Sequence, residues 1–245
     1  MLTGMNGTVA PALALRLRTA HTVVQWDRSA HPIDSEDAVR QFLDRSAPDA
    51  VCHIATGDPQ WARWIAEWCA ARRVRMLWTG SVSVFSSGTP APIAPDATPN
   101  ATDDYGSYKT HCEKLVREAC PDAVVARLGW QIGRTPAGNT MTGFLDRTAR
   151  ENSGLIRAST RWTPSCALLE DTAAGLEKLI PTPHRGVFHL EGNSQGLSFF
   201  DIAQRIRTRL GAAWTLQPAD EPAFDNRMTD PRIDMGRLSD RLSAG

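Results

Sequence analysis

Apolar and polar positions follow two different rhythms along the first half of the chain. Short apolar runs rich in β-branched residues predict strands, at residues 22–26, 50–55, 74–79 and 123–129. Between the second and third runs, Trp61, Trp64, Ile65 and Trp68 recur at helical spacing, so we expect a helix whose stripe faces the core. Helical patterns of about 10–15 residues separate such strands in βαβ units. The sequence therefore predicts an α/β fold with a doubly wound parallel sheet.

The rhythm loosens beyond residue 133. Residues 186–211 predict a late strand followed by a helix. From Ala212 the tail is rich in Asp, Pro and Arg, and we expect it to wind over the surface. We therefore expect residues 1–133 to form the first domain and residues 134–245 mainly a small second lobe, with the late strand and helix returning to the core.

A glycine-rich loop opens the first βα unit. In TGMNGTVA, residues 3–10, Gly4 and Gly7 allow the backbone to turn tightly beside a pyrophosphate, which would rest on the following helix N-terminus. This predicts a Rossmann-type NAD(P)-binding domain in residues 1–133. The expected cofactor contacts are Thr3, Gly4, Asn6, Gly7 and Thr8. Because the loop begins so early, either the sheet tolerates a short first strand or the native start lies upstream of Met1.

The end of the second expected strand carries an acid. Asp27 follows the glycine loop by about 20 residues, where a carboxylate binds the adenosine ribose of the cofactor. Arg28 beside it would instead meet a 2′-phosphate. The sequence therefore leaves the choice between NAD and NADP open.

Composition and charge narrow the class of protein only slightly. Hydrophobic residues make up 42% of the 245 residues, charged residues 22%, and the formal net charge is zero, so charge gives no reason to expect nucleic acid or an anionic membrane as a partner. No apolar run approaches the roughly 20 residues that span a bilayer, and the N-terminus does not resemble a signal peptide. The five cysteines are scattered, which indicates reduced thiols in the cytoplasm and no metal site.

The rarest polar residues gather in one short segment. The chain has two tyrosines and three lysines, and the segment YGSYKTHCEK holds both tyrosines and two of the lysines. Tyr105 and Lys109 are four residues apart and share one face of a helix. A neighbouring ammonium lowers the pKa of a tyrosine from its usual value of about 10, which makes the pair suited to acid–base catalysis. Tyr108 has Cys112 at the same spacing and lacks this possibility.

Four motifs along the chain resemble those of the extended short-chain dehydrogenase/reductases. They are TGMNGTVA, CHIAT (Cys52–Thr56), SVSVF (Ser81–Phe85) and YGSYK, in the order and spacing of that family. Within it the sequence is most similar to the dTDP-4-dehydrorhamnose reductases, from Leu2 to about Gly211.

The resemblance implies hydride transfer from a nicotinamide to a substrate ketone. Tyr105 would donate a proton to the developing alkoxide, and Ser81 would bind the carbonyl oxygen. Lys109 would hold the ribose and lower the pKa of the tyrosine. The further residues implied are His53, Ala55 and Thr56 for the cofactor, and Ser83, Trp130 and Arg161 for the substrate.

The chain also departs from those reductases. The strand-end motif usually reads S-T-D-Y-V-F, whereas TGSVSVF lacks its acid and its tyrosine. Val82 and Ser83 stand where related dehydratases carry an Asp–Glu pair, so dehydration is not expected. These departures leave the identity of the ketone open.

The leading hypothesis is an NAD(P)H-dependent ketoreductase acting on a nucleotide-linked 4-keto-6-deoxysugar or a related ketone. One alternative substrate is a non-sugar ketone of secondary metabolism. Two alternative functions are a non-catalytic, dinucleotide-binding regulatory subunit and an NAD-dependent sugar epimerase. A homodimer is possible in any of these cases, and the stereochemistry of the product stays open.

Overall fold

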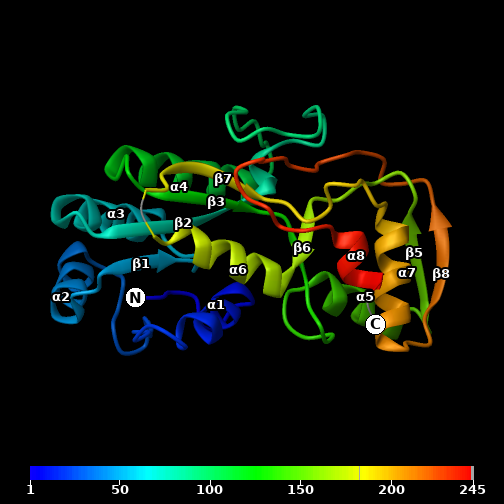
Figure 1. The fold of residues 1–245 in the computed structure, drawn as a ribbon, viewed down its shortest axis with the longest axis horizontal. Helices are drawn as coiled ribbons and strands as arrows, with labels where there is room; N and C mark the ends of the chain where they lie inside the picture. The colour runs from blue at the N-terminus through cyan, green and yellow to red at the C-terminus, as the bar shows by residue number, and fades with distance from the viewer. Residues whose placement is uncertain (182, 244–245) are drawn as a thin grey trace. The chain divides into compact units, whose positions relative to one another are not determined.

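The computed structural model describes residues 1–181 and 183–243, which divide into two compact units (Figure 1). The first unit comprises residues 1–84, 99–127 and 173–188. The second unit comprises residues 85–98, 128–172 and 189–245.

A four-stranded sheet forms the centre of the first unit. Its strands are β1 (Ala50–His53), β2 (Arg75–Ser81), β3 (Val124–Leu128) and β7 (Gly186–Leu190), in the order β1-β2-β3-β7. β1 and β2 are parallel, with Val51 opposite Met76. Near the chain start, Leu2 forms parallel bridges to Gln25 and to Cys52. The strand expected at residues 22–26 is thus only a single bridge, in a segment whose side chains are mostly exposed or half-buried.

Helices of the first unit come before β1 or between these strands in the sequence. They are α1 (Val9–Leu17), α2 (Glu36–Ser46), α3 (Pro59–Arg72), α4 (Asp104–Ala119) and α6 (Leu169–Leu179), which enters the unit at Ala173; a 3₁₀ turn, η1 (Val82–Val84), follows β2. α3 begins where Asp58 accepts a hydrogen bond from the Gln60 amide, with proline at its first position. Its expected core stripe is confirmed at Trp61, Ile65 and Trp68, each at most 2% exposed.

Two small parallel sheets belong to the second unit. β4 (Trp130–Ile132) pairs with β6 (Cys166–Leu168), and β5 (Leu155–Ser159) pairs with β8 (Thr215–Ala219). Its helices are α5 (Met141–Glu151), α7 (Phe199–Leu210) and α8 (Leu238–Ser243). The expectation that the tail from Ala212 only winds over the surface is wrong, because this tail contains β8 and α8. β8 lacks a buried face of its own and is fixed by its pairing with β5.

The late strand and the helix that follows it belong to different units. β7 joins the central sheet beside β3, as the sequence predicts for a strand returning to the core. The following helix, α7, instead buries Phe199, Ile202 and Ile206 in the core of the second unit. Which unit binds the cofactor and which binds the substrate stays a prediction.

Candidate active site

The glycine loop packs tightly against the end of β1. Gly4 has a φ of +87°, and a Cβ there would lie 2.9 Å from the Ala55 amide nitrogen, so this position requires glycine. The Gly7 amide donates to the Gly4 carbonyl at 2.8 Å, which closes the turn before α1. Within the described chain, no side chain caps α1 at Thr8, and its first turn contains no acid. The free amides at this end suit a phosphate group.

Thr3 locks the protonation state of His53. The Thr3 hydroxyl oxygen accepts hydrogen bonds from the Ile54 and Ala55 amides, at 2.9 and 3.0 Å. Its own proton therefore points to His53 Nδ1, 2.9 Å away, so His53 carries its hydrogen on Nε2. Burial, with a smaller effect from the Lys109 charge, lowers the pKa of His53 to about 3. His53 is thus a neutral, positional residue at neutral pH.

The predicted adenosine-side residues lie on exposed turns. Asp27 accepts a hydrogen bond from the Ser29 amide at 2.9 Å, which shapes the turn after Trp26. The Arg28 guanidinium donates to the Thr56 carbonyl at 3.4 Å. The structure therefore brings Arg28 and Thr56 together, while the ribose and 2′-phosphate roles stay predictions.

Helix α4 presents the tyrosine–lysine pair. The Asp103 carboxylate accepts a hydrogen bond from the Gly106 amide at 2.9 Å and caps the helix. A Cβ at Gly106 would clash with the Ser83 carbonyl oxygen, so glycine allows the first turn of α4 to lie against η1. This close approach explains why glycine follows Tyr105 and brings that tyrosine next to the end of β2.

Tyr105 and Ser81 form the candidate catalytic pair. Their side chains are hydrogen-bonded, and the Ser81 oxygen also accepts from the Ser83 amide at 3.1 Å. About half of the Tyr105 side chain is exposed (49%). Desolvation nevertheless raises the pKa of Tyr105, and the Ser81 hydrogen bond opposes this increase. The expected lowering of the Tyr105 pKa is therefore wrong for this structure, in which burial raises it and the opposing effect comes from Ser81, with Lys109 not among the causes.

Lys109 is buried one helical turn beyond Tyr105. It is 4% exposed, and its ammonium donates to the Thr79 carbonyl at 3.0 Å. The same ammonium lies 4.8 Å from the centroid of the Trp78 ring. Burial lowers the pKa of Lys109 to about 8. The sequence motif predicts the lysine, but these two partners on β2 carry no signal in the motif.

A buried ion pair supports the same helix. Arg127 on β3 donates two hydrogen bonds to the Glu113 carboxylate on α4, at 2.7 and 3.0 Å. Both side chains are at most 3% exposed. The paired geometry fixes α4 against β3. The sequence did not predict this ion pair, because Glu113 looks there like any other charged residue of a helix.

The predicted substrate residues divide between the units. Ser83 lies in the first unit, beside Ser81. Trp130 lies in the second, where it stacks on Trp162 and packs against Phe144, with ring centroids 6.1 and 5.2 Å apart. Arg161 is an exposed residue of the second unit. Substrate roles for these residues stay predictions.

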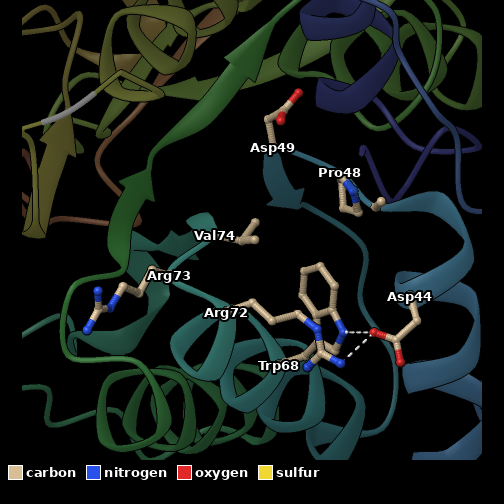
Figure 2. A pocket seen from close by; sticks show the side chains of 8 residues that line it. Asp44, Pro48, Asp49, Trp68, Arg72, Arg73 and Val74 are labelled. Atoms are coloured by element: carbon tan, nitrogen blue, oxygen red, sulfur yellow. Dashed lines mark hydrogen bonds and ion pairs between the residues drawn. The ribbon is translucent and has the colours of Figure 1, made fainter.

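A surface pocket of about 400 Å³ lies away from this chemistry (Figure 2). Asp44 forms its wall, accepting a hydrogen bond from the Trp68 indole at 2.8 Å and pairing with Arg72 at 2.6 Å. The lining residues come from the ends of α2 and α3 and from the residues just before β1 and β2. Ligands of doubly wound sheets bind at the opposite, carboxyl ends of the strands, where Ser81 lies. The pocket is therefore not the candidate active site.

Within residues 1–181 and 183–243, no group of three or more His, Cys, Asp or Glu side chains is arranged to hold a metal ion. In the same residues, no helix has both the length and the apolar character needed to cross a membrane.

Comparison with known proteins identifies the family. The family described as "RmlD substrate binding domain" matches residues 59–238. The chain belongs to this family. This match, together with the relatives and the solved structure below, confirms the resemblance to the dTDP-4-dehydrorhamnose reductases.

This chain is also similar to two proteins from Streptomyces species. One, "dTDP-4-keto-6-deoxy-D-glucose reductase" of Streptomyces niveus, is 26% identical over 234 residues, which cover 86% of this chain and 78% of the relative. The other, "Probable dTDP-4,6-dihydroxy-2-methyloxan-3-one 4-ketoreductase" of Streptomyces antibioticus, is 28% identical over 165 residues, which cover 62% of this chain and 54% of the relative. Both names describe keto reduction of dTDP-linked sugars.

A solved structure confirms the predicted fold class. The dTDP-4-dehydrorhamnose reductase of Bacillus anthracis, determined in complex with NADP, superposes with a TM-score of 0.84. The two chains are 19% identical, and the match covers 99% of this chain and 96% of the other. This RmlD-family chain is therefore an α/β protein with the Rossmann-type parallel sheet.

Proposed function

We propose that this RmlD-family chain is an NAD(P)H-dependent reductase of a dTDP-linked 4-keto-6-deoxysugar. The observation that carries the proposal is the hydrogen-bonded Ser81–Tyr105 pair, with buried Lys109 one turn further along α4. These are the three polar groups that a carbonyl reduction requires at one place: a proton donor, a hydrogen-bond donor to oxygen and a cation. The names of both Streptomyces relatives support the sugar class.

A nicotinamide dinucleotide fits the residues of the first unit. Gly4 leaves room beside the end of β1 that a Cβ would fill, and the α1 amides follow directly. When bound, the reduced nicotinamide supplies a hydride to the carbonyl carbon. Arg28 and Thr56 would lie toward the adenosine half, and Lys109 toward the nicotinamide ribose. The turnover assay with NADH and with NADPH determines whether the protein prefers the cofactor with or without the 2′-phosphate.

Tyr105 supplies the proton that balances the hydride. As the ketone becomes an alkoxide, the Tyr105 hydroxyl bond breaks and its proton moves to the former carbonyl oxygen. The raised pKa of Tyr105 keeps this hydroxyl protonated at neutral pH, as a donor must be. The Ser81 hydroxyl donates a hydrogen bond to the same oxygen and stabilises its developing charge.

The proposal is tested by measuring turnover of the sugar nucleotide by the wild-type protein and by a matched variant. Purified protein is mixed with NADH or NADPH and dTDP-4-keto-6-deoxyglucose, with and without prior 3,5-epimerisation, and loss of reduced-nicotinamide absorbance is followed. We expect turnover in the wild type and a decrease in kcat of about 10²–10⁴-fold in Tyr105→Phe.

Other outcomes separate the alternatives. Turnover only with non-sugar ketones would move the substrate class to secondary metabolism. Cofactor retained through purification and recycled without net oxidation would favour an epimerase. Cofactor binding without turnover on any ketone, alike in wild type and Tyr105→Phe, would contradict the enzyme and favour a regulatory subunit.

A further inference from the structure

Two buried cations among the described residues of the first unit, Arg127 and Lys109, have very different partners. Arg127 is 1% exposed and is neutralised by two hydrogen bonds to Glu113. Lys109 is 4% exposed, yet among the described residues no carboxylate lies within ion-pair distance of its ammonium. Burying an unpaired ammonium favours its neutral form. The structure must therefore stabilise the Lys109 charge in another way.

The titratable groups that face Lys109 offer no negative charge at neutral pH. His53 on β1 is neutral, because burial lowers its pKa to about 3. Cys112, on the next turn of α4, is a thiol whose pKa is raised by desolvation. Tyr105, on the preceding turn, also has a raised pKa. Among the described residues, the remaining contacts of the ammonium are the Thr79 carbonyl, at 3.0 Å, and the Trp78 ring.

Trp78 presents its ring to the ammonium in a desolvated position. The side chain is 2% exposed, and the ammonium lies 4.8 Å from the ring centroid, within the range of a cation–π contact. The Gly80 backbone also lies close to this ring, because a Cβ built there would come within 3.3 Å of it. The indole is thus enclosed by protein, with its face toward the ammonium.

We propose that Trp78 is a positioning residue for the reductase: its indole face stabilises the ammonium form of Lys109 and holds that side chain at the end of β2. Trp78 acts through Lys109 and needs no contact with substrate or cofactor. The consequence for catalysis rests on the proposed function, whereas the coupling between Trp78 and Lys109 is tested without turnover.

The three lysines of the chain make a direct titration possible. Protein labelled with ¹³C at lysine Cε gives one resonance each for Lys109, Lys114 and Lys178, and Lys109→Arg assigns the buried one. Lys114 and Lys178 are exposed and serve as internal references. The cofactor-free protein is titrated from pH 6 to 11, and the pKa of each lysine is read from its chemical shift.

Two substitutions at Trp78 are compared with one matched control. Trp78→Leu removes the aromatic face and should lower the pKa of Lys109 by about one unit or more, the size of a desolvated cation–π contact. Trp78→Phe keeps a weaker aromatic face and should lower this pKa by less. Trp68→Phe removes an equally buried indole, also 2% exposed, from α3 and should leave the Lys109 pKa unchanged.

The outcomes decide the inference in either direction. An unchanged Lys109 pKa in a folded Trp78→Leu protein would overturn it. If Trp78→Leu does not fold, Trp78→Phe decides by the same measure. An equal decrease in Trp68→Phe would show a general loosening of the core and would also overturn it.

Turnover then reports separately on the proposed function. If the wild type reduces the sugar, the alkaline limb of its kcat profile should shift to lower pH in Trp78→Phe, with KM for the ketone little changed. If the wild type shows no turnover, the proposed function fails while the titration result stands.

Discussion

The second tyrosine of the chain offers a sharp test of how the site is assembled. The Tyr108 hydroxyl donates to the Gly57 carbonyl at 2.9 Å and accepts from the Gly57 amide at 3.0 Å. Gly57 follows β1 in the loop that contains Ala55 and Thr56, two of the predicted cofactor contacts. One hydroxyl thus ties this loop to α4. Tyr108→Phe removes that hydroxyl and little else.

The expected loss follows from the two hydrogen bonds. Each contributes about 0.5–1.5 kcal/mol net, and the Gly57 backbone is half-buried, so water replaces them only in part. We expect the free energy of unfolding to decrease by about 1–3 kcal/mol and Tm to fall by about 2–12 °C. Because the loop gains freedom, cofactor Kd should increase several-fold, with a smaller change in kcat.

Tyr105→Phe is the matched control on the same helix. It removes the same atom from a side chain that is 49% exposed, so its effect on stability should stay within about 0.5 kcal/mol. Thermal unfolding and a fluorescence titration with NADPH measure both variants. If Tyr108→Phe matches the wild type in Tm and in cofactor Kd, the argument that Tyr108 holds the loop is refuted.

Three further predictions concern α4 and its partners. Gly106→Ala should lower kcat and cost about 1–3 kcal/mol in a denaturant titration, because its Cβ meets the Ser83 carbonyl; wild-type values would contradict the close approach. Glu113→Gln should cost about 3–5 kcal/mol in the same titration by leaving Arg127 buried without its counter-charge, and a loss below 1 kcal/mol would contradict this. Activity should fall as pH rises through about 8, where Lys109 loses its charge, and a pH–rate profile checks this. The Lys109 contribution to stability should instead rise between about pH 8 and the usual lysine pKa of 10.5, because the unfolded chain binds the proton more tightly; unfolding measured at several pH values checks this sign.

Elements with strong apolar patterns could be predicted from the sequence. The runs around residues 50–55, 74–79 and 123–129 correspond to β1, β2 and β3, because strands buried on both faces of a parallel sheet need continuous apolar residues. Residues 22–26 have a similar composition but form only one bridge. β8 went unpredicted, because an edge strand with mostly exposed side chains has no such pattern.

The candidate site, too, could be predicted only in part from the sequence. The Tyr105–Lys109 pair could be predicted, because its chemistry depends on spacing along one helix. The partners of Lys109 could not, since an apolar strand does not show which of its side chains faces a distant helix. The pKa of Tyr105 was predicted in the wrong direction, because a sequence shows that a lysine is four residues away but not that the tyrosine is desolvated or that the ammonium contacts Trp78.

Different faces of helix α4 make different contacts, which explains why both tyrosines and the buried lysine of the chain lie in this helix. Tyr105 faces Ser81 in the candidate catalytic pair, Lys109 faces the Trp78 ring, and Tyr108 binds the loop after β1. These three contacts come from successive positions of about one helical turn, so a small rotation of α4 would disturb all of them together. The ion pair of Glu113 with β3 and the glycine contact at η1 resist that rotation. The residues that hold the helix therefore determine the geometry of the proposed proton donor as directly as the candidate catalytic side chains do.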